Sequence, residues 1–142
     1  MGQDIHLVVE RKTADGWVTI RIPDGVSVRR RKPDERSMAW PVILERNRER
    51  FDALAGLGGD GPQPRGLPDD LSQSARFLVA KWEGDGFAHS WLPAAEFARI
   101  CAETERDAKR DGLATNPPEY VYLGLTKTDD IVHCRVVFWF DS

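Results

Sequence analysis

The stretch between Gly56 and Pro68 constrains the fold of this chain more than any other segment. Eight of its thirteen residues are glycine or proline, a composition that suits neither an α-helix nor a central β-strand. A connection of this length without regular structure is uncommon inside a compact domain, where it is usually either functional or mobile. The stretch therefore divides the regular elements into two groups, one before residue 56 and one after residue 68.

The first group begins with a predicted β-hairpin. Polar and apolar residues alternate over residues 4–10, and residues 17–22 form a second strand-like run. Thr13-Ala14-Asp15-Gly16 lies between the two runs and contains the Asp-Gly pair typical of a hairpin turn. After Pro41, apolar residues recur at helical spacing, which predicts a first helix that ends at Gly56.

The second group contains two predicted helices followed by two predicted strands. Ser72 is the expected cap of the second helix, and Ser90 is the expected cap of a third helix that begins near Pro93. Strand-like runs cover residues 120–126 and 131–140. The element order is then β-β-α-α-α-β-β, which predicts an α+β fold with a four-stranded antiparallel sheet packed against about three helices.

The composition is that of one domain with its own core. The chain has 142 residues, of which 41% are hydrophobic, so we expect a single domain over residues 1–142. No apolar run is long enough to span a bilayer, and the first residues lack the features of a signal peptide, so we expect a cytoplasmic protein without membrane contact. Cys101 and Cys134 lie in apolar patterns, which predicts buried structural thiols.

The charge is unevenly distributed. Residues 27–50 hold eight basic and four acidic side chains, or +4, and the remainder holds 12 basic and 19 acidic, or −7, which together give the net charge of −3. A basic segment can contact phosphates. No base-stacking motif or nucleic-acid-binding signature accompanies this one, so we favour a solvated basic loop over nucleic-acid binding.

A candidate metal site begins on the first predicted strand. Asp4 and His6 project from the same face, about 7 Å apart along the backbone. A carboxylate and an imidazole suit Zn, Mn or Fe, and His89 and either Asp69 or Asp70 are the candidates to complete the site. His89 and Asp70 are also the candidate catalytic residues, acting with a metal-bound water. The alternative is that these residues form a buried hydrogen-bonded network.

Arg65 is a candidate anion-binding residue within the glycine- and proline-rich stretch. Prolines on both sides stiffen the backbone, and a guanidinium held in this way can bind a carboxylate or a phosphate through two parallel hydrogen bonds. The alternative is an ion pair from Arg65 to Asp69 or Asp70 that braces the loop. The sequence leaves both alternatives open.

Five segments taken together resemble a known family. They are Met1 to Leu7, Arg46-Asn47 with Phe51, Leu54, Ala55 and Gly56, Pro64 to Asp70, His89-Ser90-Trp91-Leu92, and Val137 to Asp141. They are similar to segments in a family of small phage and bacterial-genome proteins that have no established activity. Members open with Met-Gly-x-Asp-Ile-His and carry Pro-Arg-Gly-Leu-Pro-x-Asp and Ser-Trp-Leu segments. The resemblance implies a phage or prophage setting and points to the candidate residues without assigning roles to them.

Two functional hypotheses follow. The first is a protein-binding accessory protein that docks on a host protein, with exposed aromatic residues such as Trp40 or Trp139 as anchors. The second is a metal-dependent hydrolase of a phosphate-ester-like substrate that uses the Asp and His residues named above, with Arg65 as the anion clamp. The sequence slightly favours the first and leaves open whether the chain is an enzyme.

Overall fold

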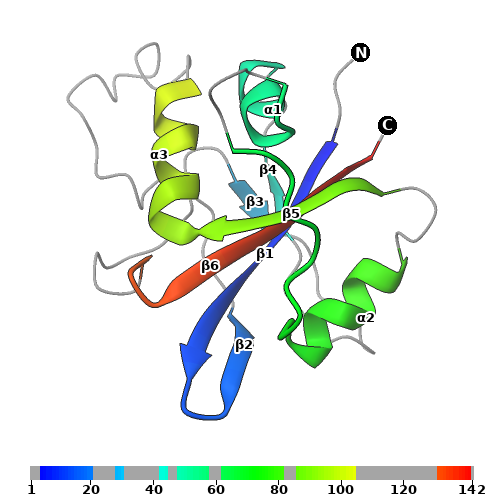
Figure 1. Ribbon diagram of the computed structural model, residues 1–142, viewed down its shortest axis with the longest axis vertical. Coiled ribbons are helices and arrows are strands. Elements are labelled where there is room, and N and C mark those ends of the chain that lie inside the picture. The colour runs from blue at the N-terminus through cyan, green and yellow to red at the C-terminus, as the bar shows by residue number, and fades with distance from the viewer. Residues whose placement is uncertain are drawn as a thin grey trace.

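Two strands from opposite ends of the chain, β1 (Asp4–Thr13) and β6 (Cys134–Asp141), pair at the centre of an antiparallel sheet (Figure 1). The computed structural model describes residues 4–20, 28–30, 42–44, 48–57, 62–81, 86–104 and 131–141. The other strands are β2 (Gly16–Ile20), β3 (Val28–Arg30), β4 (Val42–Leu44) and β5 (Phe87–Pro93). The strand order is β3-β4-β1-β6-β5, and β2 also pairs with β1.

The described residues include three helices beside the sheet, α1 (Arg48–Leu54), α2 (Gln73–Lys81) and α3 (Ala94–Thr104). The predicted α+β class, with an antiparallel sheet and three helices, is confirmed. The described sheet has six strands. Three of them, β3, β4 and β5, are not evident in the sequence pattern. β4 occupies residues expected to form the start of the first helix. The expected strand over residues 120–126 lies outside the described residues.

The predicted hairpin with its Asp-Gly turn is confirmed. β1 and β2 pair antiparallel from Val9 opposite Ile20 to Thr13 opposite Gly16. Gly16 has a φ of +117°, a backbone conformation that residues other than glycine adopt only with strain. The Asp-Gly pair therefore sets the turn, and the turn fixes which β2 residue lies opposite each β1 residue.

Both faces of the sheet are covered. Phe138 and Phe140 of β6 belong to a core on the side of α1 and α3, together with Leu54 and Phe97. A second core on the side of α2 contains Val8, Leu71, Ala75, Leu78, Val137 and Trp139. The predicted alternation of β6 is confirmed from Cys134 onward. Val132 and His133 lie in an exposed turn before the strand, so the predicted start of this strand is too early.

The two predicted caps have different outcomes. The Ala75 amide donates to Ser72 Oγ (3.2 Å), which confirms Ser72 as the cap of α2. Ser90 does not cap a helix, because β5 continues to Pro93 opposite Arg135 and α3 begins only at Ala94.

Two further expectations concern single features. Cys101 and Cys134 are buried, as the apolar patterns predict. Within the described ranges, no helix is long and apolar enough to cross a membrane.

Candidate functional site

The end of the glycine- and proline-rich stretch lies against β5, the last strand in the described strand order. We call residues 62–72 the crossing segment. The Arg65 amide donates to Ser90 Oγ (3.0 Å), and the Gly66 amide donates to the His89 carbonyl (2.9 Å). Gly66 has a φ of +77°, which favours glycine. The segment runs across β5 toward α2 (Figure 1). The hydrogen bonds of the Arg65 and Gly66 amides fix the backbone on either side of the Arg65 side chain.

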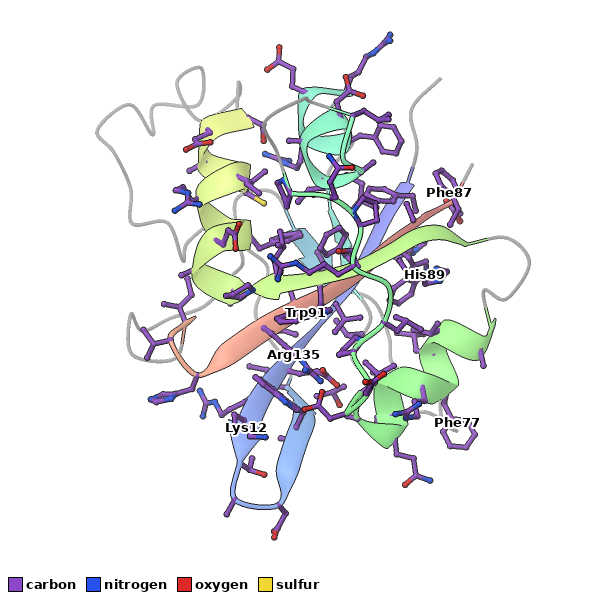
Figure 2. All side chains as sticks on the ribbon, viewed as in Figure 1. Lys12, Phe77, Phe87, His89, Trp91 and Arg135 are labelled. Carbon is purple, nitrogen blue, oxygen red and sulfur yellow. The ribbon has the colours of Figure 1, made fainter. Side chains whose placement is uncertain are left out.

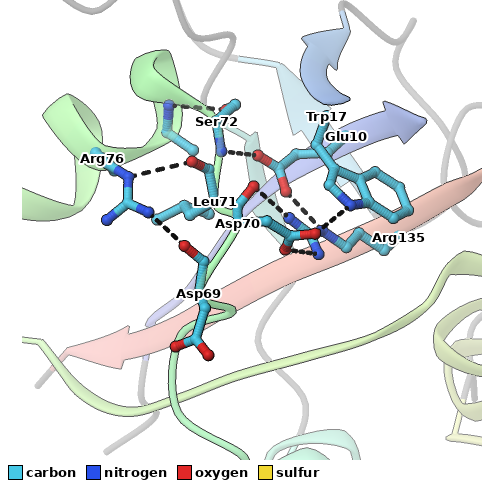
Figure 3. Close-up of polar contacts among 9 residues, drawn as sticks. Glu10, Trp17, Asp69, Asp70, Leu71, Ser72, Arg76 and Arg135 are labelled. Atoms are coloured by element: carbon cyan, nitrogen blue, oxygen red, sulfur yellow. Dashed lines mark hydrogen bonds and ion pairs between the residues drawn. The ribbon is translucent and has the colours of Figure 1, made fainter. Parts of the chain in front are cut away.

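A buried carboxylate from β1 holds the far end of the crossing segment. Glu10 is 0% exposed, and its two oxygens accept hydrogen bonds from Arg135 Nε (2.7 Å) and the Ser72 amide (2.8 Å) (Figure 3). A buried charge is tolerated when it is paired and hydrogen-bonded in this way. Glu10 therefore joins the central strands to the first turn of α2.

Asp70 forms a second carboxylate contact with Arg135. Arg135 Nη1 donates to Asp70 Oδ1 (2.8 Å), and Trp17 Nε1 donates to Asp70 Oδ2 (2.9 Å) (Figure 3). The hydrogen bond from Arg135 is the main cause that lowers the pKa of Asp70 below its ordinary value. Both carboxylate oxygens of Asp70 therefore accept from other side chains of the protein. In this structure Asp70, predicted to be catalytic, links the crossing segment to Trp17 and Arg135.

Cations and tryptophan rings alternate along this side of the sheet. Lys12 Nζ lies 5.3 Å from the Trp17 ring centre, and Arg135 Cζ lies 4.0 Å from it. The same Arg135 atom is 5.9 Å from the Trp91 ring centre, and Arg65 Cζ is 4.9 Å from that ring. We call these five residues the cation–aromatic ladder. Figure 2 shows Lys12, Arg135 and Trp91 in succession across the strands.

The members of the ladder differ in exposure. Lys12 and Arg65, at its two ends, are exposed; Trp17 and Trp91 are half-buried; and Arg135 is only 4% exposed. Arg135 is neutralised by Glu10 and Asp70. The ladder therefore presents two cations to solvent, with aromatic surface between them.

Arg65 has no ion pair with any residue that the structure describes. Asp70 pairs with Arg135, and the contact of Asp69 is made by its backbone carbonyl, which accepts from Arg76 Nη2 (2.7 Å). The carboxylate of Asp69 points away from the Arg135 network (Figure 3). The loop-bracing ion pair expected as one alternative is therefore not formed among these residues.

The two candidate histidines lie on either side of a tryptophan. The His6 ring stacks on Trp139 at 5.9 Å and 14°, and the His89 ring stacks on Trp139 at 6.3 Å and 19°. Because β6 lies between β1 and β5, the Trp139 ring separates the two imidazoles. His6 Nε2 lies 3.0 Å from Asp141 Oδ2, and burial lowers the pKa of His89.

The predicted metal ligands do not form a centre in the part of the chain that is described. No group of three or more His, Cys, Asp or Glu side chains there could hold a metal ion. The backbone of Asp4 pairs with that of Asp141, and the Asp4 side chain lies outside the description. The described geometry gives the metal hypothesis no support.

Of the two predicted aromatic anchors, only Trp139 lies in the described part of the chain. Trp139 is 1% exposed because α2 covers its face of the sheet, so its ring cannot contact a partner in this structure. Trp40 lies outside the described residues. The aromatic residues of the ladder, Trp17 and Trp91, were not among the predicted anchors.

The sequence gives only a partial signal for the ladder. Glu10 and Lys12 share the polar side of the first alternation, which places them on one face. Nothing local indicates that Arg135 lies opposite Glu10. Comparison with protein-family models, with curated proteins and with solved structures found no match.

Proposed function

We propose that the protein is a protein-binding module that docks on an acidic segment of a partner through the cation–aromatic ladder. The proposal has no catalytic step. A host protein of a phage or prophage is the partner class that the sequence resemblance suggests.

The observation that carries the proposal is the state of Arg65. Its guanidinium lies over the Trp91 ring and has no ion pair among the described residues. Its own amide donates to Ser90 Oγ, and the amide of the next residue, Gly66, donates to the His89 carbonyl. Stacking on an aromatic face leaves the N–H groups in the guanidinium plane available to a planar carboxylate. A partner would therefore meet a cation whose backbone is already ordered, which lowers the entropic cost of binding.

The neighbouring residues suit a binding surface better than a hydrolytic centre. Tryptophan and arginine are the residue types that most often dominate the energy of protein interfaces. Of the two candidate catalytic residues, Asp70 accepts hydrogen bonds from Arg135 and Trp17, and the His89 ring stacks on Trp139. This arrangement supports binding.

A selection from a displayed random-peptide library tests the proposal. The baits are the wild type, Arg65→Ala, and Arg99→Ala as the control, because Arg99 is an exposed arginine on α3 outside the ladder. We expect peptides rich in Asp and Glu to be enriched on the wild type and on Arg99→Ala, and lost on Arg65→Ala. The proposal is overturned if acidic peptides are not enriched, or if Arg65→Ala enriches the same peptides. Circular dichroism checks that all three baits are folded.

A further inference from the structure

We infer that the ladder selects extended peptide segments with one carboxylate near each end and none in the middle. This inference rests on the proposed function, and it adds the charge pattern of the partner segment.

The two ends of the ladder are the available cations. Neither Lys12 nor Arg65 has an ion pair among the described residues, and both are exposed. Arg135, between them, is already paired with Glu10 and Asp70. Carboxylates of a partner therefore find complementary charge at the two ends of the ladder.

The middle of the ladder disfavours a third carboxylate. Asp70 has a side chain that is 60% exposed, and it lies against Arg135 and Trp17. Its negative charge repels a carboxylate placed there, while the half-buried rings of Trp17 and Trp91 offer apolar contact. Repulsion at one position and attraction at two others is how a binding surface distinguishes similar ligands.

The contact distances limit the spacing of the two carboxylates. The consecutive separations along the ladder, 5.3, 4.0, 5.9 and 4.9 Å, place Lys12 Nζ and Arg65 Cζ at most about 20 Å apart. An extended chain rises about 3.3 Å per residue, and side chains at i and i+4 share a face about 13 Å apart. Carboxylates at positions 1 and 5 of an extended segment fit within this limit.

Two synthetic peptides of identical composition test this pattern. The first is acetyl-Glu-Leu-Ala-Leu-Glu-amide, with its carboxylates at the ends, and the second is acetyl-Leu-Glu-Ala-Glu-Leu-amide, with its carboxylates near the middle. Titration followed by tryptophan fluorescence at low salt measures both affinities. We expect the first peptide to bind the wild type at least about threefold more tightly, an effect of the size that one exposed ion pair supplies.

Variants then assign the preference to the ladder. We expect Lys12→Gln and Arg65→Gln each to weaken binding of the first peptide. Asp70→Asn should tighten binding of the second peptide and reduce the difference between the two. Arg48→Gln is the matched control, because Arg48 is an exposed arginine on α1. This variant should retain the wild-type preference.

The outcomes separate the inference from the proposed function. Equal affinities of the two peptides for the wild type, no detectable binding of either, or an unchanged preference in Lys12→Gln would each overturn the two-ended pattern. If the displayed library still yields acidic peptides that depend on Arg65, the proposed function stands without this pattern. If neither experiment shows dependence on Arg65, both are refuted.

Discussion

Arg135 contacts two carboxylates at nearly equal distances, yet the two should contribute very differently to stability. Arg135 Nε is 2.7 Å from Glu10 Oε1, and Arg135 Nη1 is 2.8 Å from Asp70 Oδ1. The Glu10 side chain is fully buried, whereas that of Asp70 is 60% exposed. We predict that Glu10→Gln greatly lowers the free energy of unfolding and that Asp70→Asn lowers it only slightly.

The size of the first effect follows from burial. Glu10→Gln removes the buried countercharge of a guanidinium that is 4% exposed. Breaking a buried pair costs about 3–5 kcal/mol when the remaining charge is left unpaired, and this is the upper limit here because Asp70 still pairs with Arg135. A glutamine oxygen can still accept from the Ser72 amide, but its NH2 group then faces Arg135 Nε, so the variant loses the countercharge and one buried hydrogen bond together. Water screens the Asp70 contact, so its loss costs much less.

Urea unfolding followed by circular dichroism measures both free energies, with the slope on urea concentration as a check that each variant unfolds in the same way. Arg48→Gln serves as a surface control. The reasoning is refuted if Asp70→Asn destabilises the protein as much as Glu10→Gln does. A loss below about 1 kcal/mol for Glu10→Gln would equally refute it, because that is the size expected of an exposed pair.

Three further predictions concern single positions. Gly66→Ala should lower the free energy of unfolding in urea by about 1 kcal/mol. The residue has a φ of +77° and an added Cβ meets no atom within 4 Å, so backbone strain alone causes the loss, and an unchanged stability would contradict this. Ser72→Ala should cost about 1 kcal/mol through loss of the α2 cap, and Ser72→Thr should retain most of it. Burial lowers the pKa of His89, so below its ordinary value of 6.5 the unfolded chain binds a proton that the folded chain resists. The melting temperature should therefore fall from pH 7 to pH 5 less steeply in His89→Gln, and an identical slope would exclude this contribution.

Local features of the fold can be predicted from the sequence because their determinants lie within a few residues. The hairpin turn depends on Asp15 and Gly16, and the α2 cap depends on Ser72 and the amide of Ala75. The prediction of Ser90 as a cap is wrong because a serine hydroxyl before a helix can also accept from a distant part of the chain. Its hydroxyl accepts from Arg65, 25 positions earlier.

The candidate site is less predictable because its contacts join distant parts of the chain. Arg135 meets partners 125 and 65 positions away, which no local pattern reveals. The alternation of β6 correctly places Trp139 opposite Phe138. A strand residue on the face of the sheet that points away from one core is exposed only when no other element covers that face. Here α2 covers the face that holds Trp139. The assignment of Trp139 as an anchor fails for this reason.

The central position of β6 bears on the order of events during synthesis. β1 and β2 can pair soon after they are made, because they adjoin in the chain. β5 has no partner in the described sheet other than β6, and β1 needs β6 on its inner edge. Until residues 134–141 leave the ribosome, both strands therefore present unpaired backbone and apolar side chains, which favour aggregation. A chain interrupted before β6 should be a substrate for chaperones and proteases rather than a partly active protein.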